Sequence, residues 1–246
     1  TFIDFVPVGQ GDCTLIANAN RYTLVDAGGS ARGRDPGQFI VVPYLRRQGI
    51  ASLDTVVVTH ADTDHVGGVR SVLRWTKVSR LVLPTDRTLV LDELRELAEQ
   101  ENVPVEQPQS RYRIGEISGL PPPDHLSRND RSHIHALESF ALLTGDLEAT
   151  GERWWLETAS AGNFPVLKLG HHGSNTSSSP KFLDTVSPQI AVWSAGKGNR
   201  FGHPSPEVIQ RLEDRNIRVL GTATHGLVRL KMTPERRLIV RSARSP

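Results

Sequence analysis

Apolar runs alternate along the chain with segments whose apolar residues recur at helical spacing. Strand-like runs cover residues 2–8, 13–18, 22–26, 54–59, 79–83, 140–144, 164–169, 189–194, 217–220, 226–231 and 237–241. Helical patterns cover residues 37–48, 65–74, 89–100, 148–158, 180–186 and 206–215. No internal repeat or long linker divides them. This alternation predicts one α/β domain over residues 1–246, with a mixed sheet and helices outside it.

The last helix carries the clearest boundary signal. Ser205 stands at the N-cap position and Pro206 at the first helical position, where its missing N–H is no loss. The stretch 104–135 is the least regular part of the chain, with three consecutive prolines at 121–123 and a polar run after them. We expect it to form a long loop between strands.

The segment from Thr59 to His65 is dense in metal-ligand side chains. It directly follows the apolar run 54–58 and contains His60, Asp62, Asp64 and His65. Imidazoles and carboxylates at this density, presented by a loop behind a buried strand, are typical of a metal site on a rigid scaffold.

Acidic residues also follow other strands. Asp12 ends a Gly-Gln-Gly turn that suits either an ordinary hairpin or a close approach of backbone to a ligand, and we expect Asp12 to orient the metal loop. Asp26 precedes two glycines, and we expect it to cap or orient neighbouring groups. Asp146, in Thr-Gly-Asp after an apolar strand, is placed to bridge two cations.

Two later loops combine histidines with glycine and polar residues. In the first, one of His171 and His172 is expected to bind metal and the other to serve acid–base chemistry or contact phosphate. The following Gly/Ser segment, with the hydroxyls of Ser174 and Ser177, suits an anion. The second loop contains Lys197, Asn199, Arg200 and His203. It is either a basic surface loop or, as we favour, a contact for substrate phosphate.

Composition narrows the class of protein without naming a substrate. The 246 residues are 37% hydrophobic, enough for a sizeable core, and no run approaches the roughly 18 apolar residues of a membrane span. The net charge of +2 is too small to indicate nucleic acid, and the preference for arginine over lysine fits a GC-rich genome as well as phosphate binding. One cysteine, Cys13, excludes an intramolecular disulfide. A start at Thr1, directly before a strand, suggests a piece of a longer protein.

The ordered motifs resemble those of the metallo-β-lactamase superfamily. These are His60-x-Asp62-x-Asp64-His65, Thr144-Gly145-Asp146 and the later His171. A narrower pattern is similar to the C-terminal extramembrane domain of the ComEC family, the DNA-uptake channel of natural competence. It comprises Val8 to Asp12, Asp26 to Gly29, Pro43 to Gly49, Thr59 to Gly68, Leu143 to Asp146, His171 to Ser177 and Gly202 to Pro204.

The resemblance implies a four-layer αβ/βα sandwich with two divalent metals at one edge. It implies His60 and Asp62 at one metal, Asp64, His65 and His171 at the other, and Asp146 bridging. Asp62 stands where most of the superfamily has histidine, and the histidine that many relatives place before Thr-Gly-Asp has no clear equivalent. His133 or His135 is a candidate substitute, although strand alternation puts both on one face.

The implied activity is hydrolysis of DNA phosphodiester bonds, degrading the strand that is not imported. Three carboxylates favour Mn²⁺, with Zn²⁺ or Mg²⁺ as alternatives. Metal-bound water has its pKa lowered to about 7, which supplies hydroxide at neutral pH. We expect Asp64 to hold that nucleophile, and His172 and His203 to assist charge stabilisation or leaving-group protonation. Ser174, Ser177, Lys197, Asn199 and Arg200 are the expected substrate contacts.

The same resemblance implies single- or double-stranded DNA and the membrane channel of the parent chain as partners. It places the domain outside the cytoplasm of a bacterium, at the cell surface or in the periplasm, with no membrane-binding segment of its own. Two other functions fit the residues: a small-molecule hydrolase of the same fold, and a DNA-binding module with a vestigial metal site.

Overall fold

The computed structural model describes residues 1–29, 34–159 and 162–244. The chain forms two compact units. The first comprises Thr1–Pro108, Ser194–Lys197 and Thr222–Pro246, and the second comprises Gln109–Trp193 and Gly198–Gly221. The expectation of one domain stays a prediction, and each unit is described separately below.

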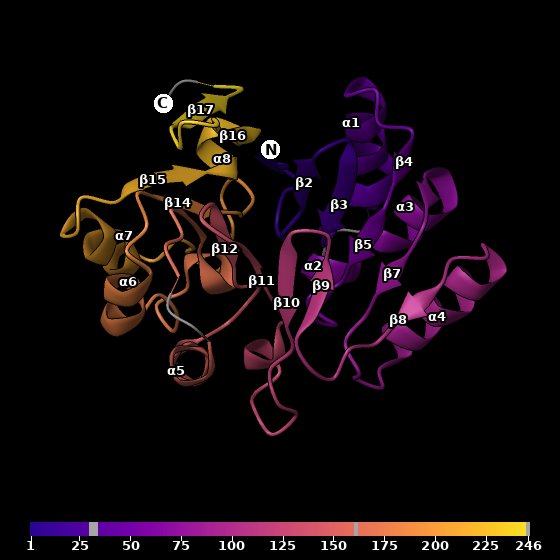
Figure 1. Cartoon of the computed structure of the whole chain (residues 1–246), viewed down its shortest axis with the longest axis horizontal. Coiled ribbons are helices and arrows are strands. Elements are labelled where there is room, and N and C mark those ends of the chain that lie inside the picture. The colour runs from indigo at the N-terminus through magenta and orange to yellow at the C-terminus, as the bar shows by residue number, and fades with distance from the viewer. Residues whose placement is uncertain (30–33, 160–161, 245–246) are drawn as a thin grey trace. The chain divides into compact units, whose positions relative to one another are not determined.

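Among the described residues, the first unit contains an eight-stranded mixed sheet in the order β17-β16-β1-β2-β3-β5-β7-β8 (Figure 1). The strands are β1 (Phe2–Phe5), β2 (Thr14–Asn18), β3 (Arg21–Val25), β5 (Thr55–Val57), β7 (Leu81–Val82), β8 (Val105–Glu106), β16 (Val228–Met232) and β17 (Leu238–Ser242). Pairing is antiparallel from β17 to β3 and parallel from β3 to β8. A separate pair joins β4 (Ser52–Leu53) to β6 (Lys77–Val78).

Several helices of the first unit bury apolar residues in the core beside this sheet. They are a π-helical turn (Gly37–Val41), α1 (Val42–Arg47), α2 (Thr63–Val66), α3 (Val69–Trp75), α4 (Leu89–Gln100) and α8 (Thr222–His225). In α4, Leu91, Leu94 and Leu97 recur at helical spacing and join the core that Leu24, Val56 and Leu81 form on the sheet. The predicted helices at 37–48, 65–74 and 89–100 are therefore confirmed as helical regions.

A buried ion pair ties the first strand to α1 and β16. Asp4 is fully buried, and its carboxylate accepts hydrogen bonds from the Tyr44 hydroxyl and from Arg229, whose Nε lies 2.6 Å from Oδ1. Burial and the Asp4 charge raise the pKa of Tyr44. Tyr44 lies in the segment from Pro43 to Gly49 that is similar to the ComEC family, and its hydrogen bond to Asp4 stabilises the fold.

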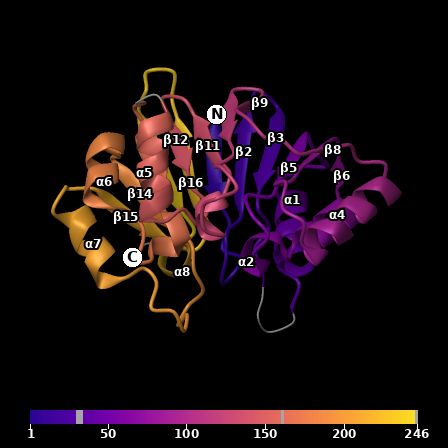
Figure 2. The ribbon, with the colours of Figure 1, turned by 90° about the horizontal axis from the view of Figure 1, so that it is seen from below.

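The second unit contains, within the described residues, a seven-stranded sheet in the order β15-β14-β13-β12-β11-β10-β9. The strands are β9 (Tyr112–Ile114), β10 (Ile117–Leu120), β11 (Ile134–Leu137), β12 (Ala141–Leu143), β13 (Val166–Lys168), β14 (Ile190–Trp193) and β15 (Arg218–Gly221). Figures 1 and 2 show α5 (Ala149–Thr158), α6 (Pro180–Val186) and α7 (Pro206–Glu213) beside its parallel strands β12 to β15. The cap of α7 is confirmed, since the Ser205 hydroxyl accepts a hydrogen bond from the Val208 amide at 3.2 Å.

The expectation of a long loop over residues 104–135 is wrong. This stretch contains β8, β9, β10, the start of β11 and a 3-10 turn (Asn129–Arg131). The strands are two to four residues long and interrupted by polar residues, so they leave no apolar run. The local signal is the two-residue turn at Gly115, whose φ of 59° glycine adopts without strain.

Within the described residues, we find no helix that combines the length and apolar character needed to cross a bilayer.

Candidate metal centre

In the first unit, the predicted metal loop connects β5 to α2. Its two histidine rings lie together, with centroids 4.2 Å apart, and His60 and His65 are 1% and 0% exposed. The Nε2 atom of His60 is 3.9 Å from Oδ2 of Asp62, which stands at the N-cap position of α2. Asp62 and Asp64 are partly exposed. Of the sequence-predicted residues of this loop, His60 therefore lies close to both His65 and Asp62.

Asp26 fixes the loop from behind. Its Oδ1 accepts a hydrogen bond from the Thr59 amide at 2.8 Å, and its Oδ2 accepts one from the Thr59 hydroxyl at 2.8 Å. Nδ1 of His65 lies 2.7 Å from the same Oδ2, which leaves Nε2 as the nitrogen for a metal. Burial raises the pKa of Asp26, against the opposing effect of His65 and Thr59. The predicted orienting role of Asp26 is thus confirmed.

Glycines allow two turns to pack against the metal loop. A Cβ on Gly11 would lie 2.0 Å from the carbonyl oxygen of Asp64, and one on Gly29 would lie 1.7 Å from that of Thr63. The amide of Asp12 donates to the same Asp64 carbonyl at 3.0 Å. A carboxylate oxygen of Asp12 lies within 4.8 Å of a ring nitrogen of His65. Asp12 therefore adjoins the candidate ligands as well as bracing their loop.

In the second unit, Asp146 lies beside His172. Both are buried, at 3% and 1% exposure, and Oδ1 of Asp146 is 3.6 Å from Nε2 of His172. Asp146 follows β12, and its amide donates to the Ser132 hydroxyl at 3.0 Å. His171, His172 and Gly173 have φ values of 44°, 57° and 84°, three consecutive left-handed residues. Such strain in non-glycine residues is concentrated at functional sites.

His171 has different neighbours from His172. Its Nδ1 lies 3.0 Å from Oε1 of Glu148, and about a quarter of its side chain is exposed. Oε1 of Glu148 also accepts from the Thr176 hydroxyl at 2.6 Å. The left-handed turn therefore directs His172 toward Asp146 and His171 toward Glu148. Sequence reasoning missed Glu148, because nothing in its spacing marks it as a partner of a residue 23 positions later.

The two predicted serine contacts belong to the loop itself. Ser177 is 1% exposed, and its hydroxyl donates to the carbonyls of Gly170 and Ser174 at 2.7 and 2.9 Å. Ser174 is 5% exposed and its hydroxyl pairs with that of Thr176 at 2.9 Å. Both side chains are buried and hold the backbone of the loop in place, and their assignment as substrate contacts stays a prediction.

The later loop surrounds His203, which is half-buried. The Asn199 side chain accepts from the His203 amide at 3.0 Å and donates to its carbonyl at 2.6 Å, so Asn199 shapes this loop. The ring centroids of His203 and His171 are 5.5 Å apart. Arg200 is exposed and lies 5.0 Å above the Phe201 ring. Lys197, in the first unit, is also exposed.

His135 of β11 and His133, which directly precedes that strand, lie on the same side, as strand alternation predicts. The Tyr112 hydroxyl is 3.2 Å from Nδ1 of His133 and 2.7 Å from Nε2 of His135. Burial lowers the pKa of His133 to about 4, and burial with the neighbouring His133 lowers that of His135 to about 3. Both imidazoles are therefore neutral and engaged with a tyrosine.

Comparison with known proteins identifies the family to which the chain belongs. A family model described as the metallo-beta-lactamase superfamily matches residues 6–197. The chain is 32% identical over 93% of its length to ComE operon protein 3 of Bacillus subtilis, and 32% identical over 99% to Recombination protein 2 of Haemophilus influenzae. Competence protein ComA of Neisseria gonorrhoeae is 34% identical over 89% of the chain. The match spans 33%, 30% and 30% of these relatives, about a third of their length.

Solved structures resemble the chain at the level of the fold. A diphosphatase from the PhnP family aligns with a TM-score of 0.51 and 14% identity, covering 78% of this chain and 85% of that one. A structure from Parabacteroides distasonis aligns with a TM-score of 0.51 and 15% identity, covering 87% and 90%. At this identity the likeness concerns architecture alone.

Proposed function

Because the chain belongs to the metallo-beta-lactamase superfamily, we propose that it is a divalent-metal-dependent phosphodiesterase that hydrolyses DNA. The fold predicted from the motifs is confirmed by the family match and by the solved structures. The superfamily establishes a metal-dependent hydrolase class, and DNA as the substrate is our proposal.

The names of the relatives support this choice of substrate. Competence and recombination are processes that involve DNA. The first word stands in the name of a relative that matches 89% of the chain, and the second in the name of one that matches 99%. Because the chain spans about a third of those relatives, its association with a membrane channel and its extracytoplasmic position are parts of the proposal.

The donor set fits divalent cations. We assign His60, Asp62, Asp64 and His65 of the first unit, and Asp146 and His172 of the second, as the residues that would hold them. His172 replaces His171 in this set because His172 lies beside Asp146 while His171 is directed to Glu148. When bound, such cations activate water at neutral pH and neutralise phosphate charge. The three carboxylates make Mn²⁺ our choice over Zn²⁺ or Mg²⁺.

Other residues are placed to handle the substrate. His171 and His203 are partly exposed neighbours, which suits a shared contact to a phosphate oxygen or protonation of the leaving oxygen. The exposed Lys197 and Arg200 suit the DNA backbone, which binds through contacts to its phosphates. Asn199 contributes by holding His203 in place.

The observation that carries the proposal is the buried contact between Asp26 and His65, whose loop also presents Asp62 and Asp64. A carboxylate at Nδ1 of a histidine holds the ring in one tautomer and orients its Nε2 for a metal. An acidic loop that binds no metal would not need a histidine held in this way.

The test is DNA cleavage by the purified protein with Mn²⁺, Mg²⁺ or Zn²⁺, and with a chelator. We expect cleavage with Mn²⁺, none with chelator, and none by Asp146→Asn. Asp184→Asn is the matched control, because Asp184 belongs to the same unit and pairs with Arg215 on its surface. Intact DNA across all three metals, with the protein folded and loaded with metal, would refute the nuclease assignment.

A further inference from the structure

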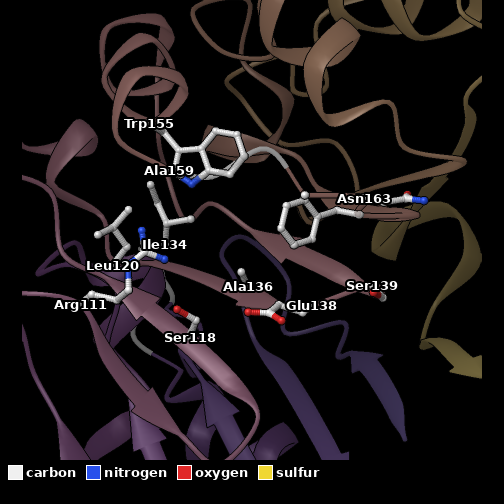
Figure 3. Close-up of a pocket in the computed structure, with 12 residues that line it drawn as sticks. Arg111, Ser118, Leu120, Ile134, Ala136, Glu138, Ser139, Trp155, Ala159 and Asn163 are labelled. Atoms are coloured by element: carbon white, nitrogen blue, oxygen red, sulfur yellow. The ribbon is translucent and has the colours of Figure 1, made fainter.

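A cavity of about 350 Å³ lies in the second unit, apart from the candidate metal ligands. Figure 3 shows its lining, which comes from β10, β11 and α5 and from the segments beside them. Ile134 and Ala136 face it from β11, so by strand alternation it opens on the opposite face of that strand from His133 and His135. Its volume is at the small end of the roughly 300–1,000 Å³ typical of ligand pockets.

One wall of the cavity is aromatic. Trp155 of α5 and Phe164 are each 4% exposed, and their ring centroids are 6.3 Å apart with the planes inclined by 59°. Leu120, Ile134 and Ala136 supply aliphatic surface around them. The faces of a flat ligand ring would therefore find both aromatic and aliphatic contacts.

Polar groups stand at defined places in this apolar surface. Ser118 is 7% exposed and lines the cavity, and its hydroxyl makes no hydrogen bond within the part of the chain that the structure describes. Arg111 is exposed at one end, and Asn163 and Ser139 lie toward the other (Figure 3). Across the described residues, Arg111 forms no ion pair, so its guanidinium can bind an anionic group of a ligand.

We propose that this cavity binds a small ligand made of a planar aromatic ring and an anionic group, such as a mononucleotide. The ring would pack against Trp155, the buried Ser118 hydroxyl would bond to a polar atom of the ring, and Arg111 would hold the phosphate or carboxylate. The inference is independent of the nuclease proposal, because it uses none of the metal-ligand residues.

The experiment is calorimetric titration of the intact protein, in chelator and again in Mn²⁺. The probes are deoxyadenosine monophosphate, naphthoate, deoxyadenosine without phosphate, and deoxyribose phosphate without a base. We expect deoxyadenosine monophosphate, naphthoate or both to bind in both buffers. Deoxyadenosine, which lacks the charge, and deoxyribose phosphate, which lacks the ring, should bind about tenfold more weakly. Tighter binding of deoxyadenosine monophosphate would identify the ligand as a nucleotide, and tighter binding of naphthoate would identify it as an aromatic carboxylate.

Variants connect the binding to the cavity. Ala136→Leu should fill it and abolish binding, and Arg111→Ala should weaken binding about tenfold. Arg153→Ala, an exposed arginine on α5 outside the lining, is the matched control and should bind like the wild type. Trp155→Phe should remove any ligand-induced change in tryptophan fluorescence.

Three results would overturn the proposal: no binding of either complete probe by the wild type, binding that survives Ala136→Leu in a protein of unchanged melting temperature, or binding that disappears in chelator. The last result would assign the ligand to the metal centre instead.

Discussion

Nδ1 of His65 lies 2.7 Å from Oδ2 of Asp26, and neither side chain is more than 2% exposed. The two residues are 39 positions apart, yet Asp26 also holds Thr59 at the start of the loop that carries His65. One carboxylate thus determines both the ring orientation of a candidate ligand and the path of the backbone leading to it.

Asp26→Asn should therefore weaken metal binding while leaving the ligands in the chain. The amide keeps the shape of the side chain but loses the charge that fixes the His65 tautomer, and loss of such a partner typically costs 10–100-fold in metal affinity. Titration with Mn²⁺ measures the effect. Asp54→Asn is the control, because Asp54 accepts the Tyr22 amide at an exposed position of the same unit. Equal affinity of the two variants would contradict the orienting role.

Gly11 and Gly9 provide a matched test of the close approach to the metal loop. Both have positive φ, 116° and 88°, but only a Cβ on Gly11 meets another atom, the Asp64 carbonyl oxygen at 2.0 Å. Gly9→Ala should cost roughly 1–2 kcal/mol from backbone strain. Gly11→Ala should cost roughly 1–3 kcal/mol more, because the loop must move. Unfolding in denaturant measures the stability of the two variants. Equal losses of unfolding free energy would show that the packing around Gly11 tolerates the added methyl group.

The metal loop could be predicted from sequence because its ligand residues are contiguous and follow a buried strand. The different partners of His171 and His172 could not be predicted. They depend on two successive residues in the left-handed conformation, which changes the directions in which neighbouring side chains point. The strands between residues 104 and 135 were missed for a different reason. Their pairing partners, such as Gly119 opposite Tyr112, make the sheet by backbone hydrogen bonds without an apolar run.

The contrast between the two histidines gives a prediction. His172→Ala should lose both metal affinity and DNA cleavage, because His172 adjoins Asp146. His171→Ala should keep most of its metal affinity and lose cleavage, because His171 is bonded to Glu148. Metal content after dialysis separates the two effects. The opposite pattern, with metal lost only in His171→Ala, would restore the assignment of His171 as the ligand.

The buried histidines His133 and His135 predict a loss of stability in mild acid. In the unfolded chain each takes up a proton near pH 6.5, whereas the folded pKa is about 4 for His133 and about 3 for His135. The unfolded state binds more protons below pH 6.5, so stability should fall as the pH decreases from there toward 4. At pH 5 the loss is roughly 2 kcal/mol for each histidine.

His135→Gln tests this origin of the acid sensitivity, because glutamine offers Tyr112 a hydrogen-bond partner and does not titrate. The variant should lose less stability between pH 7 and pH 5 than the wild type, whatever its stability at pH 7. Parallel pH profiles for the two proteins would show that other groups cause the loss.

Asp62 provides the last test, because it is the ligand position where this chain departs from most of its superfamily. Its Oδ2 lies 3.9 Å from Nε2 of His60 at the start of α2, and the residue is partly exposed. Exchange of a carboxylate for an imidazole makes a site softer, so Asp62→His should raise the affinity for Zn²⁺ relative to Mn²⁺. Competition between the two metals measures the ratio, which we expect to change by about tenfold or more. DNA cleavage in Mn²⁺ should fall in the same variant. An unchanged metal ratio would show that Asp62 lies outside the metal-binding set and that the hardness of the site has another origin.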